Sequence, residues 1–93
     1  MMKKAKARHI LVKKEKKAKE LLSLIQAGSK FEDIAIEYST CPSGKKGGDL
    51  GTFSKGEMVP EFDEVVFKAS PNKVHGPIKT GFGFHLIEIL ERH

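Results

Sequence analysis

The sequence predicts an α+β domain in which helices cover an antiparallel sheet. Two observations indicate this class: segments near both ends alternate between apolar and polar residues, as strands do, and three segments between them repeat at helical spacing. A length of 93 residues with 39% hydrophobic content is enough for one modest core and too little for two. We therefore expect residues 1–93 to form a single domain.

A change in period separates the first strand from the first helix. Residues 5–12 alternate, which predicts a strand that carries His9 on the same face as Ala7. Residues 13–27 then repeat at helical spacing, and Gly28 follows where a C-terminal cap belongs. We therefore expect a helix that ends at Gly28.

A second helix and a long loop come next. Ser29 and Glu32 have the spacing of a capping box, which predicts a helix that continues to Tyr38. Residues 41–56 contain five of the nine glycines and predict a loop with one short strand at about residues 49–53. A compact chain of this size has little room for an idle loop, so we expect this one to be ordered and to form a site.

The last third of the chain predicts one helix and two strands. Pro60 suits the first turn of a helix, and the acidic residues after it complement the helix dipole. Residues 74–79 predict a short strand, residues 80–83 a hairpin turn, and residues 84–91 a long final strand.

Several classes of protein are excluded by composition. The longest apolar runs contain three residues, far below the roughly 20 of a membrane helix, and no apolar stretch follows the N-terminal lysines as in a secretory signal. A single cysteine, Cys41, cannot form an intrachain disulfide, and no paired spacing of zinc ligands is present. We therefore expect a cytoplasmic protein with no metal and no membrane partner.

Positive charge is concentrated at the N-terminus. The net charge is +5, and the segment from Lys3 to Lys19 holds nine Lys or Arg residues and one acid. This segment could attract nucleic acid or another anionic partner weakly, although most of its lysines are expected to face solvent and keep the domain soluble.

Three polar residues are candidates for a site. His9 and His85 each lie in the middle of a predicted strand among apolar neighbours, so their imidazoles can meet if the two strands pair. Such a pair is either a buried structural contact or part of a site. Cys41 could be a nucleophile with a histidine as its base, whereas the glycine-rich loop lacks the fingerprints of nucleotide binding.

Four segments together resemble the parvulin family of peptidyl-prolyl cis-trans isomerases, and the small stand-alone bacterial parvulins, or rotamase C, most of all. The segments are HILV at 9–12, SGKKGGDLG at 43–51, GEMVPEF at 56–62 and GPIKTGFGFHLI at 76–87. They cover essentially the whole chain at consistent spacing. The resemblance implies a four-stranded antiparallel sheet surrounded by helices, the FKBP-like superfold, and no cofactor.

The resemblance also implies a set of site residues. Those expected to form the proline pocket are Leu50, Met58, Phe62 and Phe82. Those expected to set the polarity around the substrate carbonyl are His9, Cys41, Thr80 and His85. Because some members of the family have Asp at the position of Cys41, the resemblance implies a mechanism without a covalent thiol step. Met58 and Phe62 are four residues apart, which would place both on one helix turn.

The function implied is rotation of X–Pro peptide bonds in unfolded or flexible protein segments. The connection after the first strand is short, so no strict requirement for phosphoserine or phosphothreonine is expected. We also expect a monomer. The alternative is a module that binds proline-containing chains, as a chaperone part does, without catalysis; nucleic-acid binding by the basic N-terminus is a third and weaker possibility.

Overall fold

The computed structural model describes residues 3–92, so the expected domain limits at residues 1 and 93 lie outside the described residues. The elements in chain order are β1 (Lys4–Val12), α1 (Glu15–Gln26), α2 (Phe31–Tyr38), the 3₁₀ helix η1 (Pro42–Lys46), β2 (Asp49–Ser54), α3 (Pro60–Lys68), β3 (Val74–Thr80) and β4 (Gly83–Arg92).

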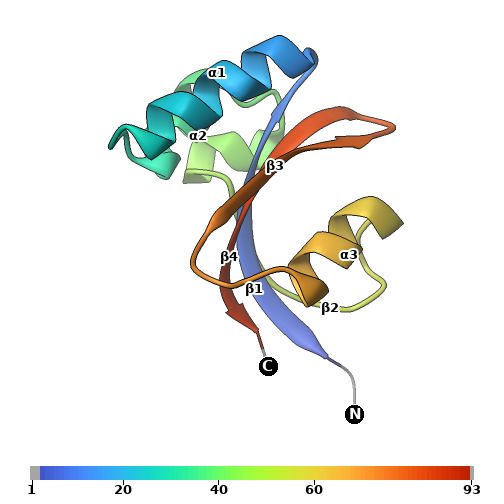
Figure 1. Ribbon diagram of the computed structural model, residues 1–93. Coiled ribbons are helices and arrows are strands. Elements are labelled where there is room, and N and C mark those ends of the chain that lie inside the picture. The colour runs from blue at the N-terminus through green and yellow to red at the C-terminus, as the bar shows by residue number, and fades with distance from the viewer. Residues whose placement is uncertain (1–2, 93) are drawn as a thin grey trace.

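The four strands form one sheet in the order β2-β1-β4-β3, and every neighbouring pair is antiparallel. The helices α1 and α2 lie on one side of this sheet and α3 lies on the other (Figure 1). The α+β class and the four-stranded antiparallel sheet are therefore confirmed. None of the helices in residues 3–92 has the length and apolar character needed to span a membrane.

Alternation along β1 creates two separate cores, one on each face of the sheet. Ile10 and Val12 pack with α1 and α2 in the first core, whereas Ala5 and Ala7 pack with α3 in the second. All four side chains are buried. Small residues of β1 therefore lie in the core that is covered by α3.

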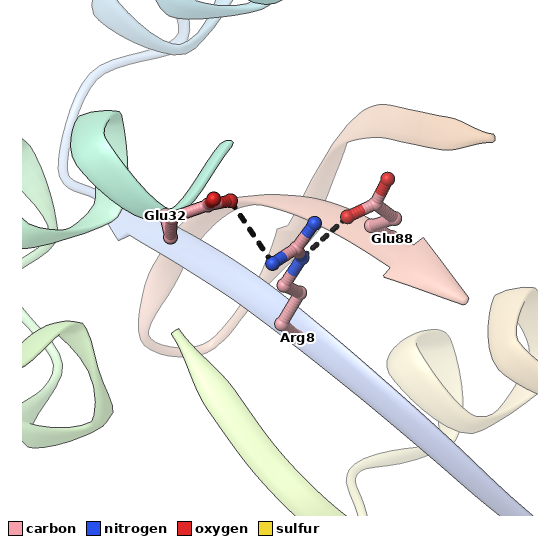
Figure 2. Close-up of polar contacts among 3 residues, drawn as sticks. All are labelled: Arg8, Glu32 and Glu88. Atoms are coloured by element: carbon pink, nitrogen blue, oxygen red, sulfur yellow. Dashed lines mark hydrogen bonds and ion pairs between the residues drawn. The ribbon is translucent and has the colours of Figure 1, made fainter. Parts of the chain in front are cut away.

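Arg8 connects helix α2 to the sheet beside the first core. Arg8 lies on β1 between the carboxylates of Glu32, at the start of α2, and Glu88, on β4 (Figure 2). Its Nη1 atom is 3.0 Å from Glu32 Oε2, its Nε atom donates to Glu88 Oε1, and its guanidinium lies over the ring of Phe31. These contacts fix the start of α2 against β1 and β4.

The caps and ends that the sequence predicted for the first two helices are confirmed only in part. Gly28 follows α1 with a φ of 118°, and the N–H groups of Gly28 and Ser29 donate to the carbonyls of Ile25 and Leu24, as in a Schellman cap. The expected capping box is wrong: α2 has Lys30 at its N-cap and no side-chain cap. Helix α1 begins at Glu15, two residues later than predicted.

The glycine-rich loop is ordered against the sheet. It contains η1, which the sequence pattern did not predict, and β2, which was predicted. The N–H of His9 donates to the carbonyl of Gly48 at 3.0 Å, and a Cβ atom at Gly48 would clash with the carbonyl oxygen of His9. Gly48 also has a φ of 86°, a conformation that favours glycine. The loop is therefore held directly beside His9.

Candidate active site

Two buried histidines meet on the α3 face of the sheet. His9 is opposite Ile87, and His85 is opposite Leu11, so the two histidines are diagonal neighbours across the β1–β4 pair. Their Nδ1 atoms are 3.0 Å apart, and their rings lie nearly parallel with centroids 5.2 Å apart. The strand pairing that the sequence suggested thus brings the imidazoles into direct contact.

The histidine pair is the centre of a continuous hydrogen-bond chain. On one side, Thr80 Oγ1 is 2.7 Å from His85 Nε2. On the other side, His9 Nε2 is 3.1 Å from Ser43 Oγ, and the Ser43 hydroxyl donates to Cys41 Sγ at 3.3 Å. The chain therefore connects the end of β3 to the start of η1 through the middle of the sheet.

Burial keeps both histidines neutral. Burial, with a smaller effect from the nearby His85, lowers the pKa of His9 from 6.5 to about 4. Burial also lowers the pKa of His85, and the carboxylate of Glu61 opposes this effect. In a neutral pair with two Nδ1 atoms at hydrogen-bond distance, one nitrogen donates and the other accepts.

The direction of the hydrogen bond from Ser43 to Cys41 determines which atoms donate and which accept in the rest of the hydrogen-bond chain. Because the Ser43 hydroxyl donates to Cys41, its oxygen accepts from His9 Nε2–H. His9 Nδ1 is then the acceptor for His85 Nδ1–H, and His85 Nε2 accepts from the Thr80 hydroxyl. Each buried polar group thus has a partner, and no charge is needed in the pair.

An aromatic ring from α3 closes one side of the pair. Phe62 lies edge-on to both imidazoles, with centroid distances of 5.5 Å to His9 and 5.6 Å to His85. It also contacts Phe53 of β2, and only 3% of its surface is exposed. Phe62 is therefore both part of the second core and part of the site.

A cavity of about 400 Å³ opens beside these rings. Its lining consists of His9, Leu11, Thr40, Cys41, Pro42, Leu50, Met58, Val59, Phe62, Phe82 and His85. Every predicted site residue except Thr80 lines this cavity. Thr80 lies behind it, buried, and is bonded to His85.

One detail of the predicted pocket is wrong. Met58 precedes α3, which begins at Pro60, so Met58 and Phe62 do not share a helix turn. They reach the same cavity because the loop before α3 is held in place: Ser54 N–H donates to Glu57, and Gly56 N–H donates to Asp63. Carboxylates on either side of Met58 therefore fix its position.

Some residues of the site were missed by the sequence analysis. The additional lining residues are Leu11, Thr40, Pro42 and Val59. Leu11 could have been found from alternation, because it lies two residues beyond His9 on the same strand. Ser43 could not, because its contact with His9 depends on how the loop folds back onto β1.

The arrangement is suited to binding rather than to bond cleavage. The cavity combines an apolar wall, formed by Leu50, Met58 and Phe62, with a polar wall of neutral groups. Within residues 3–92 no three side chains of His, Cys, Asp or Glu gather where they could hold a metal ion. What the site can do is hold a small apolar ring beside polar groups that carry no net charge.

Comparison with known proteins places this chain in a family. The family model described as the PPIC-type PPIase domain matches residues 1–93. Foldase protein PrsA of Geobacillus kaustophilus is 44% identical over 90 residues, which are 96% of this chain and 32% of that protein. Foldase protein PrsA of Bacillus subtilis is 46% identical over 89 residues, which are 95% of this chain and 30% of that protein. The chain thus spans about a third of the length of these relatives.

Solved structures agree with this placement. The crystal structure of the peptidylprolyl isomerase PrsA from Bacillus anthracis is 35% identical, with a TM-score of 0.95 over 99% of this chain and 43% of that chain. The solution structure of NmPin, the parvulin of Nitrosopumilus maritimus, is 40% identical, with a TM-score of 0.84 over 95% of this chain and 96% of that chain. The resemblance found in the four sequence segments is confirmed, and this chain belongs to the PPIC-type, or parvulin, family of peptidyl-prolyl isomerase domains.

Proposed function

We propose that the chain catalyses cis-trans isomerisation of the peptide bond before proline in unfolded or flexible protein segments, without a covalent step. The observation that carries this proposal is one cavity with an apolar cup on one side and a neutral, fully hydrogen-bonded histidine pair on the other. The names of the relatives, foldase and peptidylprolyl isomerase, support it.

The size of the barrier makes this geometry sufficient. Rotation about an X–Pro bond crosses about 18–20 kcal/mol and takes tens to hundreds of seconds without a catalyst. An acceleration of about 10⁴-fold requires only about 5–6 kcal/mol less. No bond is broken, so an apolar cup that holds the ring while the carbonyl swings, in surroundings that favour the twisted amide, is enough.

Each wall has its own role in this mechanism. Leu50, Met58 and Phe62 hold the pyrrolidine ring, with Phe82 at the rim. The polar wall of Cys41, His9 and His85 faces the carbonyl as it leaves the amide plane, and Thr80 positions His85 through its hydrogen bond. The Cys41 thiol acts as part of this wall and not as a nucleophile.

A phosphate next to proline is not required in this proposal. Only residues 13 and 14 connect β1 to α1, which leaves no extended loop in which basic side chains could surround a phosphate. Turnover of a Ser-Pro peptide and of its phosphorylated form tests this point. A preference above about a hundredfold for the phosphorylated peptide, equal to about 2.7 kcal/mol, would contradict it.

Three predictions about the wider protein belong to the same proposal. The chain is a monomer, it works in the cytoplasm, and its basic segment from Lys3 to Lys19 binds anionic partners only weakly. Sedimentation and filter binding with nucleic acid at two salt concentrations test the first and third, because counterion release gives a steep salt dependence.

The deciding experiment measures isomerisation directly. Exchange spectroscopy on a proline tetrapeptide, with and without purified protein, reports the rate of cis-trans interconversion. We expect substoichiometric protein to accelerate it strongly. Interconversion no faster than in buffer, together with shifts that show peptide binding at Met58 and Phe62, would support the non-catalytic binding module instead.

A further inference from the structure

Glu32 makes an ion pair with Arg8 on the side of β1 that faces away from the cavity. Figure 2 shows its side chain reaching from the start of α2 over β1 toward the guanidinium, and Oε2 is 3.0 Å from Arg8 Nη1. The side chain of Glu32 is 42% exposed, and an ion pair with so much solvent contact adds little to stability. The second carboxylate on Arg8, that of Glu88 on β4, is only 19% exposed.

The base of the Glu32 side chain lies against the glycine-rich loop. A Cβ atom built at Gly47 would lie 2.7 Å from the Cβ of Glu32 and 3.3 Å from its Cα, so the loop has no room for a side chain here. Gly47 also has a φ of 71°, a conformation that favours glycine. One end of the Glu32 side chain therefore contacts the loop, and its other end is anchored by Arg8.

The next residue of the loop contacts the backbone of His9. The N–H of His9 donates to the carbonyl of Gly48 at 3.0 Å, and a Cβ atom at Gly48 would lie 2.3 Å from the carbonyl oxygen of His9. We call Gly47 and Gly48 the glycine turn. Through this turn, Glu32 on α2 and His9 on β1 are connected by direct contacts.

The glycine turn also bears on the position of Ser43. The N–H of Gly48 donates to the carbonyl of Ser43 at 2.9 Å, which ties the backbone of Ser43 to the turn. The hydroxyl of Ser43 is 3.1 Å from His9 Nε2 and donates to Cys41 Sγ. Because the links of a buried hydrogen-bond network depend on one another, a displaced turn would affect the whole chain from Cys41 to His9.

We propose that Glu32 is a positioning residue for the site, which supports the glycine turn and thereby keeps Ser43 within hydrogen-bond distance of His9. The inference rests on the proposed function, because it gives Glu32 a part in that reaction. Glu32 does not line the cavity, so it acts through the hydrogen-bond chain and not on the substrate. With Ser43 in place, His9 keeps the tautomer that accepts from His85, and the polar wall faces the substrate carbonyl in one fixed arrangement.

Two alanine variants separate this role from the ion pair as such. Glu32→Ala and Glu88→Ala each remove one carboxylate from Arg8, but it is Glu32 that lies against the glycine turn. We expect Glu32→Ala to lower kcat of the folded protein by at least about fivefold, because small misplacements of the groups around the reacting bond are costly. Its KM should stay within about twofold, because the proline cup is unchanged. Glu88→Ala should leave both constants within about twofold.

A conservative variant and a double variant test the route. Glu32→Gln keeps the base of the side chain against Gly47 and an acceptor for Arg8, so it should recover most of the lost kcat. Ser43→Ala should lower kcat by itself. If Glu32 acts through Ser43, adding Glu32→Ala to Ser43→Ala should lower kcat no further.

The imidazole of His9 gives a readout that does not need turnover. Its nitrogen NMR resonances report whether Nε2 keeps the hydrogen bond to Ser43. Glu32→Ala should shift the Nε2 resonance in the same direction as Ser43→Ala does, whereas Glu88→Ala should leave it in place.

Several outcomes would overturn the inference. Equal loss of kcat in Glu32→Ala and Glu88→Ala would make Glu32 an ordinary ion-pair partner. A double variant that loses the product of the two single effects would show that Glu32 acts independently of Ser43. If the wild-type protein turns over no peptide but the His9 resonance still moves in Glu32→Ala, the proposed function fails and the positioning of Ser43 stands. If turnover is normal and the resonance does not move in Glu32→Ala, the inference fails alone.

Discussion

The two faces of the sheet are built from the same strands but differ in how completely they are packed. On the face covered by α1 and α2, Ile10, Leu21 and Leu86 are fully buried, and the polar residue Arg8 stays at the edge in ion pairs. On the face covered by α3, two histidines lie inside, and Leu50, Met58 and Val59 are only partly buried. We call the face covered by α1 and α2 the closed face, and the face covered by α3, which leaves a cavity beside polar groups, the open face.

This difference shows where the domain can carry a site without losing its fold. The core of the closed face consists of apolar side chains, and the charged groups of Arg8, Glu32 and Glu88 pair with one another outside it. The open face contains polar atoms whose hydrogen bonds run through residues from β1, β3, β4 and the loop before β2. Changes in the core of the closed face should therefore affect stability alone, and changes at the residues of the open face that line the cavity should affect both stability and catalysis.

The largest combined effect is expected for Phe62→Ala. Removal of this buried ring should lower the free energy of unfolding by about 3–5 kcal/mol and kcat/KM of the folded protein by more than about tenfold. Urea unfolding and peptide turnover measure the two effects. Phe67→Ala is the matched control, because Phe67 is buried in the same core but does not line the cavity. Equal loss of turnover in both variants would contradict the pocket.

On the closed face, Leu21→Ala should change stability alone. Leu21 is fully buried, so its truncation should cost about 2–5 kcal/mol of unfolding free energy while kcat/KM per folded molecule stays within about twofold. Leu24→Ala on the same helix, where the residue is 43% exposed, should cost less than about 0.5 kcal/mol. If Leu21→Ala lowers turnover by more than the loss of folded protein explains, the core of the closed face also affects catalysis and the distinction between the two faces is wrong.

Acid should destabilise the domain through the open face. Because burial lowers the pKa of His9 from 6.5 to about 4, its contribution to stability is fully present above pH 6.5 and is lost as the pH falls toward 4. This loss is about 3 kcal/mol, and the lowered pKa of His85 acts in the same direction. Urea unfolding at about pH 7 and about pH 4.5 measures it. In a His9→Gln variant, the free energy of unfolding should change much less between these two pH values. If it changes as much as in the wild-type protein, the pH dependence does not come from the histidine pair.

The smallest effect is expected for Cys41→Asp. An aspartate carboxylate can accept the hydroxyl hydrogen of Ser43 as the sulfur does, so kcat/KM should stay within about tenfold of the wild-type value. Peptide turnover at neutral pH measures it, with Cys41→Ala as the variant that removes the acceptor. Complete loss of activity in both variants would indicate a thiol mechanism.

Elements with a strong local pattern were predicted well from the sequence. Alternation in β1 and β4 predicted the strands and the meeting of His9 with His85, and Pro60 marked the start of α3. The capping box at Ser29 was wrong because Lys30 takes the N-cap position. Of the site, the proposed residues came mostly from the family resemblance; alternation and spacing alone left a structural histidine pair and a reactive cysteine as open alternatives.

By itself, the amino-acid sequence determined the order of the strands and α-helices, the two faces of the central strands and the histidines that share one of these faces, because these features follow from the period of neighbouring residues. Only the tertiary structure decided that Ser43 connects His9 to Cys41, that Phe62 is both core and site, and that Phe82 stays uncovered beside Leu11. These features join residues that are distant in the chain. Their contacts depend on how the glycine-rich loop and the β3–β4 hairpin pack against the sheet, which no local pattern encodes.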